Sequence, residues 1–365
     1  MKRLVLCLRI IGGDSYVGGL NGVVNAYCAH KSDFEENGFR PEIYSYSLPE
    51  RLDIKFGPLN NILYAICQRH DAKKKFRGCT DAVFHIHTSR GQMFVRDVLL
   101  ARAMSRMGIK TVMTIHVGSI DTVFKGTELL KNMLIKIMSR YISAVLFMSN
   151  EVRGEFIRAG LDEEKARTLY NFYDLPEAAN ENGLLSCKGG ITLRAVYFGS
   201  LNREKGIREL LEAMERTEGV TLDICGSATE SGFEGWFDEK CAELKDKVKY
   251  HGYVSGKEKY GLLKRADVLL LPSHREGFPI STLEGIASGC ALVITPAGAM
   301  KEVYTDKNAV FVRPGSAGDI ADALTELCRN RVRLREMQKN NIRYSAQFTV
   351  NKHIASLCRI ISGIL

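Results

Sequence analysis

The sequence predicts an α/β protein built from two doubly wound domains, each with a mostly parallel sheet between layers of helices. Two observations support this fold. Short apolar runs alternate with longer helix-like segments along the chain, which is typical of βαβ units. The alternation stops near residues 174–190, where Pro, Asn and Gly gather without periodicity, as they do in linkers. The 365 residues are enough for about two domains with sizeable cores.

The first domain is predicted to span residues 1–178, followed by a linker at 179–190. Its elements are expected at apolar runs and at the segments between them: strands at 4–10, 82–86, 111–115 and 144–148, and helices at 20–37, 92–107 and 127–141. The opening MKRLVLCLRIIGGD has a basic tip, but Arg9 interrupts its apolar run and no small-residue cleavage pattern follows. We therefore expect a buried strand there rather than a signal peptide.

The second domain is predicted to span residues 191–347 and shows the same alternation. Its strands are expected at 195–198, 220–224, 248–250, 268–271 and 291–294, and its helices at 206–217, 231–245, 256–265, 280–288 and 317–328. A further amphipathic helix is expected at 350–364. In open α/β sheets, ligands bind beyond the carboxyl ends of the strands, so we expect a central cleft between the domains that faces those ends.

Composition leaves the class of partner open but locates the excess charge. Hydrophobic residues make up 45% and charged residues 25%, which argues against a disordered or collagen-like chain. The net charge of +9 comes from residues 1–142, with 21 basic and 12 acidic residues, whereas residues 143–365 hold 30 of each. A basic half favours nucleic acid, an anionic membrane or an acidic substrate. The sequence has no recognisable nucleic-acid module, so we expect no nucleic-acid partner.

The cysteines and the apolar runs indicate the compartment. The ten cysteines are scattered singly, without a CxxC pair, which favours buried thiols in a reducing environment. No stretch reaches the ~18 apolar residues that a membrane-spanning helix needs. We therefore expect a cytoplasmic protein.

The sharpest chemical feature is LPSHREGFPISTLEGIASGC, residues 271–290. Pro279 suits the first turn of a helix, which places Glu276 on the loop before that helix and Glu284 inside it. The unpaired N–H groups of a helix start attract phosphate, and carboxylates on either side accept hydrogen bonds from sugar hydroxyls. A nucleotide sugar has this chemistry. Two solvated carboxylates, or the acid and base of a glycosidase, fit the same spacing.

A second candidate feature is YFGSLNREKGIRELLEAM, residues 197–214, where a strand passes through a turn at Gly199 into a helix. Arg203 and Lys205 lie near the helix start, where helix electrostatics alone would favour acidic residues. Basic side chains at the start of this helix therefore indicate a binding site for an anion. Ordinary surface charge, balanced by neighbouring glutamates, is the alternative interpretation.

Strand ends in the first domain carry glycines and histidines. The opening turn IIGGDSYVGGLNGVV resembles a phosphate-binding loop, but it matches neither a G-x-G-x-x-G fingerprint nor a Walker A sequence. Among His85, His87 and His116, we prefer His116 as functional because its strand should end at the cleft, although a structural hydrogen bond is the alternative. The sequence has no Asp-x-Asp motif, H-E-x-x-H motif or clustered His/Cys set, so no metal site is expected.

Together these segments resemble the retaining, GT-B-fold glycosyltransferases of glycosyltransferase family 4, also called group 1. The resemblance depends most on EGFPISTLE at 276–284, which is similar to the E-x7-E motif of that family, and on GIASGCALVIT at 285–295. Further matching segments are the Gly-Gly opening loop, His116 after its strand, YNFYD at 170–174, FGSLNREKG at 198–206, HGYVS at 251–255 and KRADVLLLPS at 264–273. Their order and approximate spacing agree with the family across nearly the whole chain.

The resemblance implies a role for each matching residue. Those expected in catalysis are Glu276, His116 and Lys205. Those expected to contact the donor sugar, diphosphate, ribose or base are Gly12, Gly13, Gly199, Arg203, Lys205, Tyr253, Val254, Glu276, Gly277, Phe278, Pro279, Ser281, Thr282, Leu283 and Glu284. In particular, the resemblance implies that Glu276 holds the sugar, Lys205 the diphosphate and Glu284 the ribose. Ser200 replaces an arginine that the family often has, and Arg203 is the expected substitute.

The resemblance also implies the reaction. A sugar would pass from a UDP- or GDP-linked donor to a hydroxyl of a glycan acceptor, such as a lipid-linked oligosaccharide or a surface polysaccharide precursor, without a metal or other cofactor. The last segment, 348–365, would cross back to complete the first domain. A GT-B-fold epimerase, a phosphorylase and a non-catalytic sugar-nucleotide-binding partner of another transferase are the alternatives. The oligomeric state is not predicted.

The basic excess also suggests a peripheral contact with an anionic membrane at the inner face of the cell membrane. Lys73, Lys74, Lys75 and Arg77 form one basic run, and the predicted helix at 127–141 mixes an apolar stripe with basic residues. Each basic residue near an anionic leaflet contributes roughly 1 kcal/mol of attraction. A core-packing helix with a solvated basic edge is the alternative interpretation.

Overall fold

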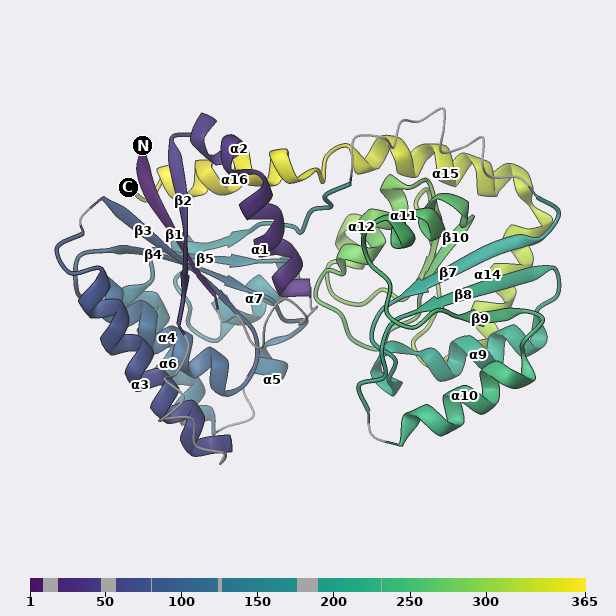
Figure 1. Ribbon diagram of the computed structural model, residues 1–365, viewed down its shortest axis with the longest axis horizontal. Helices are drawn as coiled ribbons and strands as arrows, with labels where there is room; N and C mark the ends of the chain where they lie inside the picture. Colours follow the sequence, from purple (N-terminus) through teal and green to yellow (C-terminus); the bar gives the residue numbers. More distant parts are fainter. Residues whose placement is uncertain (9–18, 47–56, 80, 124–126, 176–189, 231) are drawn as a thin grey trace. The chain divides into compact units, whose positions relative to one another are not determined.

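The computed structural model describes residues 1–8, 19–46, 57–79, 81–123, 127–175, 190–230 and 232–365 (Figure 1). The chain divides into two compact units. The first unit holds Met1–Asn171 together with Val350–Leu365, and the second holds Phe172–Thr349. The predicted boundary at residue 178 and nearly all of the predicted linker lie outside the described residues.

The first unit contains a six-stranded parallel sheet in the order β2-β1-β3-β4-β5-β6. The strands are β1 (Lys2–Leu8), β2 (Phe39–Ser45), β3 (Ala82–Thr88), β4 (Lys110–Ile115), β5 (Ala144–Phe147) and β6 (Ala166–Thr168). The helices are α1 (Gly19–Ala29), α2 (Lys31–Glu36), α3 (Gly57–Lys75), α4 (Gln92–Ser105), α5 (Ile120–Val123), α6 (Glu128–Tyr141), α7 (Asn150–Arg158) and α16 (Val350–Ser362). Every residue of β3 and β5 is buried, which explains why these strands are continuous apolar runs in the sequence.

The second unit contains another six-stranded parallel sheet, in the order β12-β11-β10-β7-β8-β9. The strands are β7 (Leu193–Phe198), β8 (Val220–Cys225), β9 (Val248–Tyr250), β10 (Val268–Leu271), β11 (Ala291–Ile294) and β12 (Ala309–Phe311). The helices are α9 (Ile207–Arg216), α10 (Phe233–Glu243), α11 (Gly256–Arg265), α12 (Ile280–Ala287), α13 (Met300–Val303), α14 (Ala317–Arg329) and α15 (Arg331–Ser345). The chain winds outward in both directions from β7 and β10, so the ends of these two strands mark the switch point where ligands of such sheets bind.

The last helix, α16, belongs to the first unit, whose second segment begins at Val350, two residues after the start predicted for it. Figure 1 shows it as the yellow helix beside α2. Its buried residues recur every three or four positions: Val350, His353, Ile354, Leu357, Cys358 and Ile361. The imidazole of His353 is hydrogen-bonded to the Tyr27 hydroxyl at 2.7 Å and to the carbonyl oxygen of Tyr170 at 2.8 Å, which ties α16 to two other segments of this unit.

Two general findings concern cysteines and membrane spans. The cysteines of the described residues are all free thiols, four of them buried. Within the same residues, the helices are all too short or too polar to cross a membrane.

Candidate functional site

Two loops at the carboxyl edge of the second sheet bring the strongest sequence features together. β7 and β10 are adjacent and parallel, so the loops that follow them leave the sheet at the same edge. The backbone N–H of His274 donates to the carbonyl oxygen of Glu204 at 2.8 Å, which links the two loops directly. The loop after β7 therefore carries Lys205 to the loop that carries Glu276.

Gly206 permits this close approach. Its φ of +71° lies in the left-handed region, and a Cβ atom built there would come within 2.2 Å of the Pro272 carbonyl oxygen. A side chain at this position would push the two loops apart. The glycine of the FGSLNREKG segment is thus required by geometry as well as by backbone conformation.

Substitution of Gly206 by Ala should lower the free energy of unfolding of the second unit by about 2–4 kcal/mol, because the backbone strain and the clash with Pro272 add. Urea denaturation monitored within this unit measures the change. The matched control is Gly235→Ala in α10, where a Cβ atom meets nothing within 4 Å and the added methyl favours the helix. Equal stabilities of the two variants would contradict this account of the loop contact.

The centre of the site is an ion pair between Lys205 Nζ and Glu276 Oε1 at 2.7 Å. The side chains are 26% and 9% exposed, so the pair is partly shielded from water but remains accessible. Tyr197 is fully buried, and its hydroxyl donates to the Ser200 carbonyl oxygen at 2.9 Å. Burial and the negative charge of Glu276 both raise the pKa of Tyr197, so the phenol stays protonated.

Helix α12 begins directly after the Glu276 loop, with Pro279 in extended conformation before its first residue. No side chain among the described residues caps this helix start. The Thr282 hydroxyl donates to the Pro279 carbonyl oxygen at 2.8 Å and accepts from the Tyr304 hydroxyl at 2.9 Å. Thr282 and Leu283 are fully buried, and the Thr282 N–H donates to the Pro279 carbonyl oxygen at 3.2 Å. Ile280 and Ser281, the first two residues of the helix, are partly exposed. The helix start offers backbone N–H groups to an anion beside the Lys205–Glu276 pair.

Glu284, one turn into α12, pairs with Lys259 of α11 at 2.5 Å and is 7% exposed. Lys259 also lies over the ring of Phe198, the last residue of β7, with its Nζ 5.5 Å from the ring centroid. Lys259 is not predicted from the sequence, because no motif around it indicates a partner 25 positions further along the chain. Its ammonium fixes the position of the Glu284 carboxylate.

The other predicted residues of this unit lie at the same sheet edge in different environments. Arg203 is a surface residue whose Nε lies 3.2 Å from Glu230 Oε1, so its guanidinium pairs with a glutamate rather than with the Lys205–Glu276 pair. Tyr253 is 49% exposed, whereas Val254 is buried. The loops after β8 and β9 are joined by the Gly226 N–H, which donates to the Gly252 carbonyl oxygen at 2.8 Å.

Three predicted positions contribute mainly backbone or packing. A Cβ atom at Gly199 would lie 2.7 Å from the Tyr197 hydroxyl oxygen, so this position has no room for a side chain as the loop stands. The Gly277 carbonyl oxygen accepts from the Ala299 N–H at 2.8 Å, and Phe278 is buried. The predicted roles of all these residues toward a donor stay predictions.

His116 of the first unit lies within a cluster of four histidines, completed by His85, His87 and His353. The ring nitrogens His87 Nδ1 and His116 Nε2 are 3.0 Å apart, and His85 Nε2 is 2.8 Å from the Thr114 hydroxyl. Burial, together with the neighbouring His353, lowers the pKa of His116 to about 3. His116 is therefore a neutral hydrogen-bonding group at pH 7. Gly12 and Gly13 lie outside the described residues.

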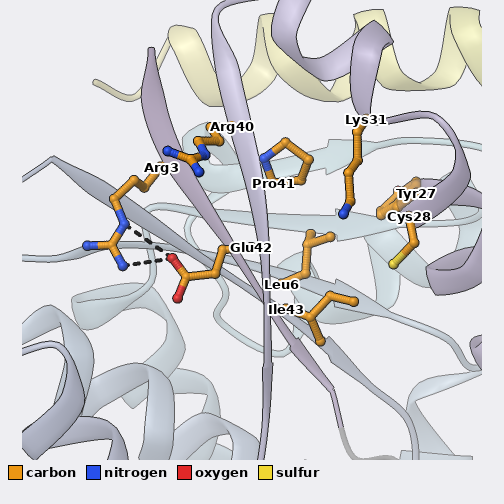
Figure 2. A pocket seen from close by; sticks show the side chains of 9 residues that line it. All are labelled: Arg3, Leu6, Tyr27, Cys28, Lys31, Arg40, Pro41, Glu42 and Ile43. Carbon is orange, nitrogen blue, oxygen red and sulfur yellow. Dashed lines mark hydrogen bonds and ion pairs between the residues drawn. The ribbon is translucent and has the colours of Figure 1, made fainter.

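A cavity of about 480 Å³ lies elsewhere in the first unit, beside β1 and β2 (Figure 2). It is lined by Arg3, Leu6, Tyr27, Cys28, Lys31, Arg40, Pro41, Glu42 and Ile43. None of the residues predicted to bind a donor lines this cavity. Within the described part of the chain, no group of three or more His, Cys, Asp or Glu side chains could hold a metal ion.

Residues 192–345 match the family model of glycosyl transferases, group 1. This segment contains nearly all of the second unit, including Lys205, Glu276 and Glu284. The match is limited to that part of the chain.

Two curated relatives and one solved structure extend the comparison. An uncharacterised glycosyltransferase of Methanocaldococcus jannaschii is 31% identical over 132 residues, which span 34% of this chain and only 33% of that protein. The N,N'-diacetylbacillosaminyl-diphospho-undecaprenol alpha-1,3-N-acetylgalactosaminyltransferase of Campylobacter jejuni is 23% identical over 273 residues, 69% of this chain and 70% of that protein. HepE of Anabaena, solved in complex with UDP, matches with a TM-score of 0.74 at 17% identity over 100% of both chains. The predicted GT-B fold is confirmed by this structural likeness.

Proposed function

We propose that the protein is a retaining glycosyltransferase that moves a sugar from a UDP- or GDP-linked donor to a hydroxyl of a glycan acceptor. The observation that carries the proposal is the Lys205–Glu276 pair, 2.7 Å long, beside the uncapped start of α12. The match of residues 192–345 to group 1 glycosyl transferases and the UDP of the Anabaena structure support this class of donor. The acceptor is a lipid-linked oligosaccharide or a surface polysaccharide precursor, which the name of the Campylobacter relative supports.

In this proposal the ion pair opens when the donor binds. The Lys205 ammonium turns from Glu276 to the diphosphate, whose oxygens also accept hydrogen bonds from the first N–H groups of α12. The Glu276 carboxylate is then available to accept hydrogen bonds from sugar hydroxyls. Lys205 thereby recognises the diphosphate and Glu276 the sugar of the same donor. Before the donor binds, each of these two charged side chains neutralises the other.

The same cations promote the reaction. As the bond between the sugar and the diphosphate breaks, negative charge grows on the leaving oxygen, and a fixed ammonium and helix start stabilise it. The acceptor hydroxyl attacks on the face that the diphosphate leaves, and a leaving phosphate oxygen takes its proton. The sugar thus keeps its anomeric configuration. The positive charge comes from the protein itself, so the proposal includes no metal or other cofactor.

Two further groups have supporting roles in the proposal. Glu284 accepts hydrogen bonds from the ribose hydroxyls, and Lys259 holds its carboxylate in place from a distance of 2.5 Å. His116, neutral because of its buried environment, serves as a hydrogen-bonding group toward the donor sugar. Arg203 replaces the phosphate contact that Ser200 lacks only if donor binding draws its guanidinium from Glu230.

The protein is proposed to work in the cytoplasm, in peripheral contact with an anionic membrane that carries the acceptor. Helix α6 supports this location, because its outward stripe combines Leu129 and Met133, 81% and 49% exposed, with the exposed Lys136 and Arg140. Apolar and basic side chains on one exposed stripe suit the interface of an anionic bilayer.

Release of nucleoside diphosphate from a panel of sugar nucleotides, with and without a lipid-linked acceptor, tests the function. We expect release from one donor to rise at least about tenfold when a suitable acceptor is added. Interconversion of the sugar nucleotide without acceptor would instead identify an epimerase. Binding of nucleoside diphosphates without turnover across the panel would identify a non-catalytic partner.

A further inference from the structure

A second charged cavity lies at the amino edge of the first sheet, where α4 and α6 end and β4 and β5 begin. Its volume is about 490 Å³, and its polar lining includes Ser105, Lys110, Arg140, Tyr141, Ser143 and Lys165. His116 follows the opposite, carboxyl end of β4. With about 3.3 Å per residue, the strand places roughly 20 Å between Lys110 and His116. The cavity is therefore separate from the histidine cluster.

Three guanidinium groups surround the ring of Tyr141, and of these arginines Arg140 lines the cavity together with Tyr141. The Cζ atoms of Arg102, Arg106 and Arg140 lie 5.4, 5.7 and 5.6 Å from the centroid of the Tyr141 ring. Any two of these groups are thus within about 11 Å of each other, which is close to the Debye length of about 10 Å at 0.1 M salt. Their mutual repulsion is only partly screened. We call these four residues the arginine–tyrosine cluster.

The cations that line the cavity are Lys110, Arg140 and Lys165, and Arg102 and Arg106 lie beside it around the Tyr141 ring. Lys165 donates to the Ser139 carbonyl oxygen, but no carboxylate among the described residues forms an ion pair with any of these five cations. The cavity of Figure 2 differs, because there Arg3 is paired with Glu42 at 2.7 Å. The buried Nε of Arg102 also has no hydrogen-bond partner among the described residues. Positive charge and one donor are thus left uncompensated.

The phenol of Tyr141 already responds to this charge. Burial alone would raise its pKa, but the hydrogen bond with Arg102 and the charges of Arg106 and Arg140 lower it below the ordinary value. The carbonyl ends of α4 and α6 stabilise cations here and so explain part of the cluster. They do not account for a cavity lined by Lys110, Arg140 and Lys165 together with the hydroxyl-bearing Ser105, Tyr141 and Ser143.

We propose that the arginine–tyrosine cluster and its cavity bind a phosphate-bearing anion, at a site independent of the proposed donor site. Guanidinium groups match phosphate oxygens with paired N–H donors, and hydroxyl groups complete the hydrogen bonding. The anion neutralises charges that otherwise repel one another. The phosphate belongs either to a soluble compound or to a lipid headgroup. Arg140 continues the exposed stripe of α6 that carries Leu129 and Met133, which connects the cluster to the second source.

The test uses the double variant Arg106→Gln/Arg140→Gln, which changes two exposed side chains. The matched control is Lys73→Gln/Lys74→Gln, which changes two exposed lysines at the end of α3. It removes the same amount of positive charge from the same unit. Both are prepared in a Lys205→Ala background, which weakens pyrophosphate binding at the proposed donor site equally in the two variants. Circular dichroism checks that both proteins fold.

Inorganic pyrophosphate is titrated by calorimetry at constant ionic strength, and vesicles of phosphatidylcholine with and without phosphatidylglycerol are tested by co-sedimentation. Pyrophosphate binding that weakens at least about tenfold in the arginine variant and less than about twofold in the lysine control supports the site with a soluble ligand. If only binding to phosphatidylglycerol vesicles weakens in the arginine variant and not in the lysine control, the result supports the site with a lipid headgroup as its ligand. Equal effects of the two variants, or no binding of either probe to the Lys205→Ala parent, would overturn the proposal.

Discussion

Lys205→Ala and Glu276→Ala are each expected to reduce sugar transfer at least about a hundredfold while the protein stays folded. Without Lys205, the leaving diphosphate would lose a fixed positive charge that lies 2.7 Å from the carboxylate proposed to hold the sugar. Removal of one such preorganised group from a developing oxyanion typically costs 10²–10³ in rate, or roughly 3–4 kcal/mol of transition-state stabilisation. Without Glu276, the sugar would lose its proposed hydrogen-bond acceptor and with it the orientation of the reacting carbon.

The matched control is Lys240→Ala in the same unit. Lys240 pairs with Glu215 at 2.9 Å and with Glu243 at 2.7 Å, so this variant also breaks short ion pairs, but at the exposed surface of α10. Its turnover should stay within about twofold of the parent. Nucleoside-diphosphate release measures all three variants, and near-normal turnover in both Lys205→Ala and Glu276→Ala would refute the assignment of the site.

The first unit should lose stability in mild acid more steeply than the second unit. Burial first, and neighbouring histidines next, lower the pKa of His85 to about 3 and hold that of His87 well below its usual range. Burial likewise lowers the pKa of His353 to about 4. In the unfolded chain each histidine titrates near pH 6.5. Below that pH the unfolded state binds more protons than the folded state, so stability present above pH 6.5 is lost as the pH falls.

Below about pH 6, the free energy of unfolding falls by about 1.4 kcal/mol per pH unit for each histidine that stays neutral in the folded state. For the cluster as a whole, we expect a loss of about 3–5 kcal/mol between pH 6 and pH 5. Hydrogen exchange of amides in β3 and β4, compared with those in β7 and β10, measures the difference between the units. His85→Leu should reduce the slope by about one proton, or about 1.4 kcal/mol per pH unit. Parallel pH profiles for both units would contradict the prediction.

The alternation of apolar runs predicts the buried strands but not the edge of the first sheet. It predicts strands buried on both faces, such as β3, β5, β10 and β11, and also the partly exposed β8 and β9 of the second sheet. β2 escapes prediction because it is an edge strand with Pro41 and mostly accessible side chains. α15 escapes because its buried side includes polar residues. Asn341 there donates to the carbonyl oxygens of Cys290 and Asn308 at 2.7 and 2.9 Å.

The candidate site is predictable to the extent that its residues share a local pattern. Glu276 and Glu284 stand in one motif, and Lys205 follows a strand end with its own glycine turn. Lys259 and His353 have no such pattern, because their partners, Glu284 and Tyr27, are near only after the chain folds. The arginine–tyrosine cluster also lacks a local sequence pattern, because its residues come from the ends of two helices, α4 and α6. Charge counts place these basic residues in the first domain without showing that they converge.

Calorimetric titration of UDP and GDP into the protein and into Lys205→Ala tests the central claim most directly. The claim is that the Lys205 and Glu276 loops with the start of α12 hold a nucleoside diphosphate. We expect one nucleoside diphosphate to bind in a 1:1 complex, with affinity at least about tenfold weaker in Lys205→Ala because a charge-assisted contact is lost. No binding of either nucleotide, or equal affinity in the parent and the variant, would contradict the account.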